Sequence, residues 1–249
     1  MRENDLMIIE RCIENKNEKL DVKEEPFEKL MFFYKSALKQ LELQMNIIKD
    51  EFKLIYNYDL IDHIDTRIKE PKSIVKKMEK KKYDKTYLNL IEKINDIAGI
   101  RIVCTLKDDI FFIRDLVKQI PDIHVLKEKD YVTNPKESGY KSYHMLVSVP
   151  IFLSDSVVDT KVEIQIRTIA MDFWASLEHK IYYKFEGDAP DYISRDLREC
   201  AEMVSTLDEK MLSLNEAIQE CLEKQEELNM STKTKESNRQ DQRVLQGLD

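Results

Sequence analysis

Lys161-Val-Glu-Ile-Gln-Ile-Arg-Thr168 is the stretch that decides the fold. Apolar and polar residues alternate strictly along it, which predicts a β-strand with two unlike faces. The apolar face carries Val162, Ile164 and Ile166, and the polar face carries Glu163, Gln165 and Arg167. A polar strand face is often no more than a solvated surface. Here the strand leads directly into residues 169–184, and this context favours a site for a charged ligand.

Residues 169–184 show helical spacing of apolar side chains, which predicts an amphipathic helix packed back on the sheet. The apolar positions are Met171, Trp174, Leu177 and Ile181. The same segment carries Glu178, His179, Lys180 and Lys184 beside the polar strand face.

The composition indicates a soluble, helix-rich α+β domain with helical additions. The chain has 249 residues, of which 35% are charged and 42% hydrophobic, and only four are glycine and six proline. The formal net charge of −8 argues against bulk attraction to nucleic acid or to an anionic membrane. RNA binding stays possible but is not indicated by charge, and any anion site must be a local basic patch.

The four cysteines are widely spaced and form no C-x-x-C pair, which disfavours both a zinc site and a disulfide framework. Reduced thiols in the cytoplasm are the simple interpretation. We see no secretion signal and no membrane span in the sequence, and we expect a cytoplasmic protein.

Four regions are predicted along the chain. Residues 1–25 are expected to be a flexible N-terminal extension, and residues 26–187 a core that begins with a long amphipathic helix over 26–55. Residues 188–228 are expected to be C-terminal helices with a coiled-coil-like apolar seam for oligomerisation. The polar residues 229–249 are expected to be a disordered tail. The seam comprises Leu197, Cys200, Val204, Leu207, Met211, Leu214, Ile218 and Cys221.

A basic segment over residues 64–85 is the local cationic patch. Pro71 is suited to open a helix on which Ile74 and Met78 face the core. Lys69, Lys77 and Lys80 are then placed to face one anion. A solvated lysine face is the alternative, and it is the more common outcome for lysine runs.

Further strands are predicted over residues 98–106, 123–132 and 145–150, and a helix over residues 108–120. The strand over 145–150 is expected to pair with the strand over 157–168. Asp96 stands just before the first of these strands. The loop 133–144 combines turn residues with Lys136, Lys141 and tyrosines, so it can stack a base on Tyr140 and hold phosphates. An ordinary hairpin loop with surface aromatics is equally compatible with this stretch alone.

Two acids in separate strand contexts, Asp96 and Glu163, together with the basic segment and the tyrosine loop, suggest a phosphoryl or nucleotidyl transfer site that uses Mg²⁺. This metal prefers hard oxygen ligands, bridges substrate phosphates and needs few protein carboxylates.

The motifs closely resemble the synthetase domain of the RelA/SpoT homologues, and most of all the small alarmone synthetases of the RelQ type. The resemblance covers roughly residues 27 to 210, and the joint occurrence of the motifs in order is far more specific than any single one. The matching motifs are Arg67-Ile-Lys69, Asp96-Ile-Ala-Gly-Ile-Arg101, Ser138-Gly-Tyr-Lys-Ser-Tyr-His144, Glu163-Ile-Gln-Ile-Arg-Thr168 and Phe173-Trp-Ala175 with Glu178-His179.

The resemblance implies an α+β fold in which a mixed β-sheet, nucleotidyltransferase-like synthetase core is flanked by long N- and C-terminal helices. It implies transfer of pyrophosphate from ATP to the 3′-hydroxyl of GDP or GTP, with release of AMP, by a homo-oligomer that is a tetramer in the family. Asp96 and Glu163 would hold Mg²⁺, and Glu163 would act as base or positioner at the attacking hydroxyl.

The resemblance also implies which residues bind each nucleotide. Those implied for ATP are Arg67, Lys69, Lys77, Lys80 and Arg101, and those for the guanine nucleotide are Lys136, Tyr140, His144 and Gln165. The hydrolase domain of long family members needs an upstream His-Asp metal motif. Nothing like it precedes residue 60, so we expect synthesis only.

Two rival classes stay open. One is a polymerase-β-like nucleotidyltransferase, which uses similar carboxylates but releases pyrophosphate. The other is a non-catalytic nucleotide- or RNA-binding regulator with no ATP turnover.

Overall fold

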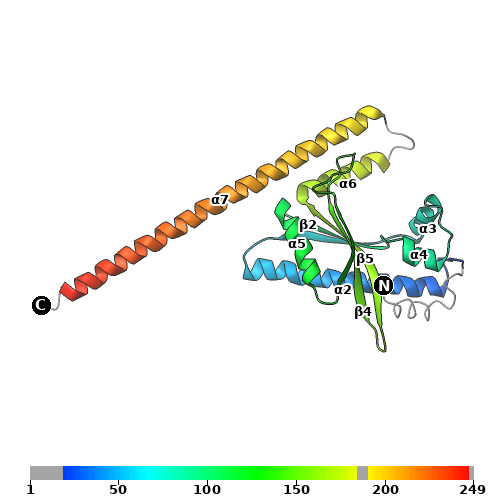
Figure 1. Ribbon diagram of the computed structural model, residues 1–249, viewed down its shortest axis with the longest axis horizontal. Helices are drawn as coiled ribbons and strands as arrows, with labels where there is room; N and C mark the ends of the chain where they lie inside the picture. Colours follow the sequence, from blue (N-terminus) through cyan, green and yellow to red (C-terminus); the bar gives the residue numbers. More distant parts are fainter. Residues whose placement is uncertain (1–18, 184–189, 247–249) are drawn as a thin grey trace. The chain divides into compact units, whose positions relative to one another are not determined.

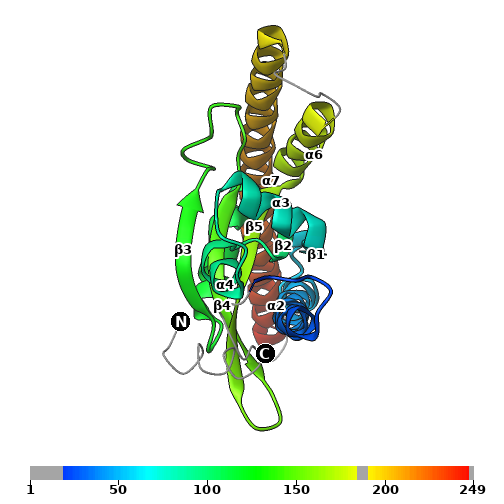
Figure 2. The same ribbon diagram turned by 90° about the vertical axis from the view of Figure 1, so that its right-hand side faces the viewer.

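The strands form one five-stranded sheet (Figure 1), in the order β1-β2-β5-β4-β3, and all five strands are labelled in Figure 2. The computed structural model describes residues 19–183 and 190–246. The strands are β1 (Ile61–Ile68), β2 (Ala98–Cys104), β3 (His124–Asp130), β4 (Tyr143–Phe152) and β5 (Val157–Thr168). β2 pairs with β5 in parallel and the other three pairings are antiparallel, so the predicted mixed sheet is confirmed.

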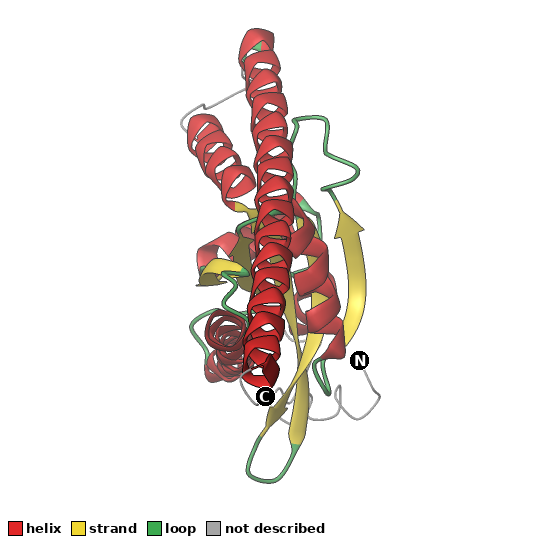
Figure 3. Ribbon diagram, turned by 90° about the vertical axis from the view of Figure 1, so that its left-hand side faces the viewer, coloured by secondary structure: helices red, strands yellow, loops and turns green. Residues whose placement is uncertain are grey.

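β5 occupies the middle of the sheet and shows the alternation that its sequence predicts. Val162, Ile164 and Ile166 are fully buried, whereas Glu163 and Gln165 are only partly covered. The predicted neighbour relation is also confirmed, because β4 pairs along its whole length with residues 157–166 of β5. Figures 2 and 3 show their joining hairpin extending past the other strands.

The apolar face of the sheet packs on two helices, α2 (Glu25–Ile55) and α5 (Lys107–Gln119). α2 begins at a proline-bearing first turn, as expected. Its buried stripe includes Ala37, Leu41 and Met45, all with no exposed surface. Because both helices contribute to the core on this face, the opposite face is left to the polar side chains of β5 and its neighbours.

Two elements were not predicted from the sequence. β1 lies at the start of the segment read as a basic patch, and α4 (Tyr87–Lys93) follows α3 (Pro71–Lys80). β1 is an edge strand whose residues are largely exposed, so no apolar alternation marks it. Its antiparallel pairing with β2 is a tertiary contact that local patterning does not reveal. The predicted burial of Ile74 and Met78 on α3 is confirmed.

The N-terminal extension is partly anchored to the core. Residues 1–18 lie outside the described residues, but Leu20 is buried and its N–H donates to the carbonyl of Lys85 at 2.8 Å. The Tyr87 hydroxyl donates to the carbonyl of Asp21 at 3.2 Å. The end of the predicted flexible extension is thus held to the core by one apolar side chain and these hydrogen bonds at residues 20 and 21.

α6 (Ile169–Tyr183) follows β5 directly, as predicted, but only its first half is packed. Met171 and Trp174 are buried, whereas Leu177 and Ile181 stay about 40% exposed. Trp174 belongs to a second, smaller apolar cluster with Ala175, Leu197 and Ala201. Its indole N–H donates to the carbonyl of Leu197 at 3.0 Å, which joins α6 to the first turns of α7.

α7 (Asp191–Gln246) is one continuous helix, so the predicted disordered tail over 229–249 is helical as far as Gln246. No glycine or proline interrupts residues 191–246, and Glu, Lys, Gln and Met favour helix even where no apolar face is buried. Residues 206–249 form a unit of their own. In that unit Leu207, Met211, Leu214 and Ile218 are each at least half exposed. No helix of the described residues is long and apolar enough to cross a membrane.

Candidate active site

The polar face of the sheet is assembled by strand register. Gln165 on β5 lies opposite Arg101 on β2 and opposite His144 on β4. Glu163 lies opposite Gly99, which in turn faces Arg67 on β1. Side chains at paired positions point to the same face. Gly99 lies between Arg67 and Glu163, and a Cβ added there would lie 3.9 Å from the carbonyl oxygen of each.

Two cavities open on this face, and Glu163 lines both. The larger, of about 390 Å³, brings together Arg67 and Arg101 with Tyr140, Gln165 and residues of α6 that include Glu178 and His179. The smaller, of about 260 Å³, contains Lys136, His144 and Tyr131. The larger cavity thus collects residues predicted for both nucleotides.

Asp96 is held by two of the predicted phosphate-binding lysines. Its Oδ2 atom accepts hydrogen bonds from Lys69 Nζ at 2.9 Å and from Lys77 Nζ at 2.7 Å. Burial by itself raises the pKa of the Asp96 carboxyl, but the hydrogen bonds from Lys77 and Lys69 outweigh it and hold the pKa below its usual value. Asp96 Oδ1 is buried and has no hydrogen-bond partner.

The donor set suits a magnesium ion that completes its shell with substrate oxygens. Asp96 Oδ1 is an orphaned buried acceptor of the hard kind that Mg²⁺ prefers, and the second predicted ligand, Glu163, is ionised nearby. Among the described residues no group of three or more His, Cys, Asp or Glu side chains comes together. This arrangement does not suit a metal that is held by protein ligands alone.

Glu163 receives polar contacts on both carboxylate oxygens. Gln165 Nε2 donates to Oε2 at 3.1 Å, and His144 Nδ1 lies 3.7 Å from Oε1, beyond hydrogen-bond length but close enough for an electrostatic contact. Burial raises the pKa of Glu163, yet His144 and Gln165 together lower it below its usual value, against the opposing negative charge of Asp96. Gly99, three residues after Asp96, pairs with Glu163, so strand register brings the two predicted acids to the same part of the sheet.

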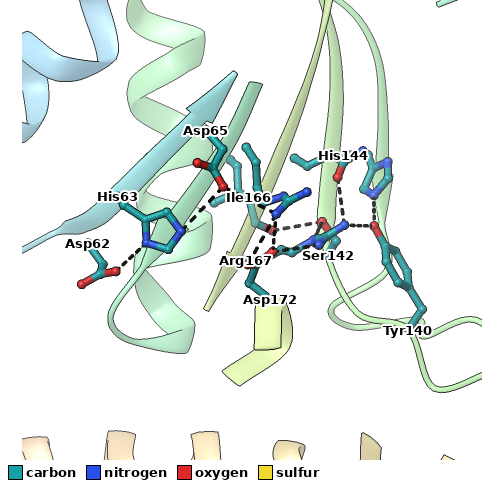
Figure 4. A network of polar contacts seen from close by, with 11 residues as sticks. Asp62, His63, Asp65, Tyr140, Ser142, His144, Ile166, Arg167 and Asp172 are labelled. Carbon is teal, nitrogen blue, oxygen red and sulfur yellow. Dashed lines mark hydrogen bonds and ion pairs between the residues drawn. The ribbon is translucent and has the colours of Figure 1, made fainter. Parts of the chain in front are cut away.

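Two residues in the network were not predicted as site residues: Arg167 and Asp172 (Figure 4). Arg167 is buried and donates to the hydroxyl of Tyr140 at 2.6 Å and to Asp172 at 3.0 Å. Asp172 Oδ1 also lies 3.1 Å from Arg101 NH1. The alternation placed Arg167 on the polar face, which was the available signal. Its burial by other parts of the chain was not visible in the sequence.

Two further residues predicted for the nucleotides, Lys136 and Lys80, lie in different surroundings. Lys136 Nζ lies 4.5 Å from the centre of the Tyr140 ring and 4.9 Å from that of Tyr131, in the geometry of cation–π contacts. Lys80, the last residue of α3, is exposed and lines neither of the two cavities.

Comparison with known proteins places the chain in a family. Residues 66–188 match the model of a region found in RelA and SpoT proteins. The chain is 44% identical over 188 residues to the GTP pyrophosphokinase YwaC of Bacillus subtilis, a match that covers 76% of this chain and 90% of that protein. The chain belongs to the RelA/SpoT family. It is also 34% identical to the GTP pyrophosphokinase YjbM of B. subtilis, over 78% of this chain and 91% of that protein.

Solved structures of RelA/SpoT family members have the same fold. A crystal structure of the small alarmone synthetase 1 from B. subtilis bound to its product pppGpp matches with a TM-score of 0.73 and 33% identity. That match covers 79% of this chain and all of the other. The small alarmone synthetase 2 from B. subtilis matches with a TM-score of 0.70 and 41% identity, over 77% of this chain and 98% of the other.

The lysine contacts of Asp96 predict a stability that depends on pH. The pKa is lowered in the folded protein, so the ionised carboxylate stabilises the fold above the unfolded-state pKa, and this contribution is lost as the pH falls through the folded-state value. Asp96→Asn should lower the free energy of unfolding by about 2 kcal/mol at neutral pH, the scale of hydrogen bonds to charged groups. Urea unfolding should show this difference shrinking towards about pH 3.

Asp50→Asn is the matched control, since Asp50 is exposed on α2. It should leave the unfolding free energy unchanged at either pH. A difference between Asp96→Asn and the wild type that stayed constant with pH would contradict the lysine–carboxylate account.

Proposed function

We propose that this chain is a GTP pyrophosphokinase that transfers pyrophosphate from ATP to the 3′-hydroxyl of GDP or GTP. The products are AMP and guanosine tetra- or pentaphosphate, the alarmones of the stringent response. The observation that carries the proposal is one cavity lined both by residues predicted for ATP and by residues predicted for the guanine nucleotide, with Glu163 on its wall. The names of the relatives support it: two curated relatives are GTP pyrophosphokinases. Since both nucleotides are cytoplasmic metabolites, we place the reaction in the cytoplasm.

The cations of the first half of the chain serve ATP. Arg67 and Arg101 line the larger cavity, where their guanidinium planes flank the adenine. Lys69 and Lys77 converge on one point, the Asp96 carboxylate, and so present two positive charges to a single anionic group. Lys80 would contribute from the end of α3. A solved small alarmone synthetase 1 that carries AMPCPP, with 32% identity to this chain, supports an ATP site in this fold.

The acceptor nucleotide lies on the Tyr140 side. Tyr140 supplies the ring on which guanine stacks, and Lys136, His144 and Gln165 surround it with donors. Stacking alone accepts any base, so these polar groups provide the orientation that brings the 3′-hydroxyl to Glu163.

Asp96 and Glu163 would hold Mg²⁺. When bound, the ion would supply charge neutralisation to the phosphates. The protein's own part is to present ionised carboxylates, and both acids have pKa values below their usual ones. Lys69 and Lys77 both donate to Asp96 Oδ2, which pairs the carboxylate and leaves one lysine charge in excess.

In the reaction the 3′-hydroxyl oxygen forms a bond to the β-phosphorus of ATP, and the bond from that phosphorus to the α,β-bridging oxygen breaks. AMP carries away the electron pair, and the hydroxyl proton passes to Glu163 or to solvent. Because the pKa of Glu163 is lowered, its carboxylate is better suited to orient the hydroxyl than to retain the proton. Alignment and charge neutralisation are the main requirements of phosphoryl transfer.

Separation of the products of labelled ATP tests the proposal. With GDP or GTP present, ATP labelled in the adenosine part should yield AMP, and a γ-phosphate label should appear in the guanine nucleotide. Release of pyrophosphate instead would indicate a nucleotidyltransferase, and guanine-nucleotide binding without ATP turnover would indicate a regulator.

Glu163→Gln is predicted to lower turnover by orders of magnitude, because it keeps the size of the side chain and loses the charge. The melting temperature should change little, since the substituted group lies opposite the buried Ile164 and Ile166. Glu92→Gln, at an exposed position outside both cavities, is the control and should retain full activity. Substantial turnover by Glu163→Gln would rule out the catalytic role.

The nucleotide assignments predict separable effects on the two Michaelis constants. Arg67→Ala should raise the KM for ATP more than that for GDP or GTP. Tyr140→Ala should instead weaken binding of the guanine nucleotide by about 1–3 kcal/mol, the usual cost of a lost stacking platform. Steady-state kinetics with each substrate varied in turn measures both. Equal effects of either variant on both substrates would contradict the assignments.

We also propose that the chain works as a homo-oligomer, a tetramer by resemblance, with the α7 seam contributing to the contact. The exposed apolar stripe of residues 207–218 supports this, because a solvated stripe of that length is costly to leave uncovered. Leu207→Glu with Leu214→Glu should lower the mass measured by light scattering. Ser213→Glu with Gln219→Glu adds the same charge off the stripe and should not. An unchanged mass in the first pair would contradict the role of the seam.

A further inference from the structure

Arg167 is a buried cation at the centre of the polar face. Its side chain is 7% exposed, and it is anchored by Asp172, which accepts from NH1 at 3.0 Å, and by Ser142 Oγ at 3.4 Å from Nε. Burying a guanidinium is costly unless it is paired and fully hydrogen-bonded. Its remaining nitrogen, NH2, donates to Gln165 and to Tyr140, and each of these residues leads to Glu163. Figure 4 shows Tyr140 and His144 beside Arg167.

The first arm passes through Gln165. Arg167 NH2 donates to Gln165 Oε1 at 2.8 Å, and a guanidinium has donors but no acceptor. The amide oxygen of Gln165 must therefore face Arg167. Its NH₂ group is left to face Glu163, where Nε2 donates to Oε2 at 3.1 Å.

The second arm passes through Tyr140 and His144. Arg167 NH2 donates to the Tyr140 hydroxyl oxygen at 2.6 Å, and that hydroxyl lies 2.9 Å from His144 Nε2. Once its oxygen accepts from Arg167, the hydroxyl is free to place its own proton on the bond to Nε2. Neutral His144 then carries its proton on Nδ1, the nitrogen that lies 3.7 Å from Glu163 Oε1.

We propose that Arg167 is a positioning residue that sets the direction of both hydrogen-bond arms, so that each oxygen of Glu163 faces an N–H group. The same guanidinium would hold the Tyr140 ring in place through its hydroxyl. This inference rests on the proposed function for its consequence in catalysis, but the direction of the bonds is a property of the protein without nucleotides. Arg167 itself acts through Glu163, Gln165 and Tyr140 and need not touch substrate.

The tautomer of His144 is the most direct test, and ¹⁵N NMR of the imidazole reads it in the nucleotide-free protein. At about pH 8.5, where an ordinary imidazole is neutral, His144 of the wild type should be protonated on Nδ1. Tyr140→Phe removes the proton that Nε2 accepts and should abolish this preference. Arg167→Gln replaces a pure donor by a group that also accepts, and should give a mixture of tautomers.

Activity and binding provide the second readout. Arg167→Gln should lower kcat roughly 10-fold to 100-fold, the scale on which a catalytic group misplaced by about 1 Å loses rate. It should also weaken guanine-nucleotide binding measured without ATP. Arg114→Gln is the control, because Arg114 is a partly buried arginine that, like Arg167, is paired with a carboxylate, here Asp115 on α5. It should leave the His144 tautomer, the binding and kcat unchanged.

The outcomes separate the inference from the proposed function. A wild-type His144 protonated on Nε2, or an Arg167→Gln variant with normal kcat, would overturn the positioning role. If Arg167→Gln does not fold, the wild type and Tyr140→Phe still decide the tautomer. A wild type that shows the Nδ1 tautomer but makes no alarmone from ATP and GDP or GTP would refute the proposed function and leave the network standing.

Discussion

The two faces of strand β5 lie in different environments, the apolar core on one side and the polar site on the other. The rest of the structure depends on this constraint. The apolar residues of β5 must be buried against α2 and α5, which sends every second side chain to the other face. Glu163, Gln165 and Arg167 then follow one another at about 6.6 Å, the spacing of alternate residues in a strand. This spacing suits direct side-chain contact, and the guanidinium, amide and carboxylate form one hydrogen-bonded row. Core packing thereby fixes the order of the polar groups in the site.

The cations of the site share carboxylates within the protein. Lys69 and Lys77 share Asp96, and Arg101 and Arg167 share Asp172, so each pair of cations keeps one positive charge in excess. A charge left without a partner at a half-buried position would cost free energy. We therefore describe nucleotide binding as an exchange of ion-pair partners. Under the proposed function, phosphate groups would take the place of Asp96 beside the lysines, and the freed carboxylate would become available to a metal ion. Such an exchange would keep the free-energy cost of nucleotide binding low, because no half-buried charge is left without a partner.

Local patterning was sufficient for the parts whose burial is periodic. β5, β2, α2 and α5 each bury one clear stripe, and their positions were predicted closely. β1 and α4 were missed because β1 is an exposed edge strand and α4 is only seven residues long. The exposure of Leu177 and Ile181 was likewise hidden, since spacing alone does not show where a packing partner ends. Asp96 and Glu163 were predicted from their strand contexts and from motif resemblance, whereas the role proposed for Arg167 rests only on its contacts with Tyr140, Gln165 and Asp172.

The central claim is that Glu163 stands where the two nucleotides meet. A crystal structure with Mg²⁺, a non-hydrolysable ATP analogue and GDP tests it most directly. The account predicts adenine beside Arg67 and Arg101, guanine on Tyr140, and the 3′-oxygen about 3–3.5 Å from the β-phosphorus in contact with Glu163. A guanine nucleotide bound away from Tyr140, or reacting atoms aligned out of reach of Glu163, would contradict it.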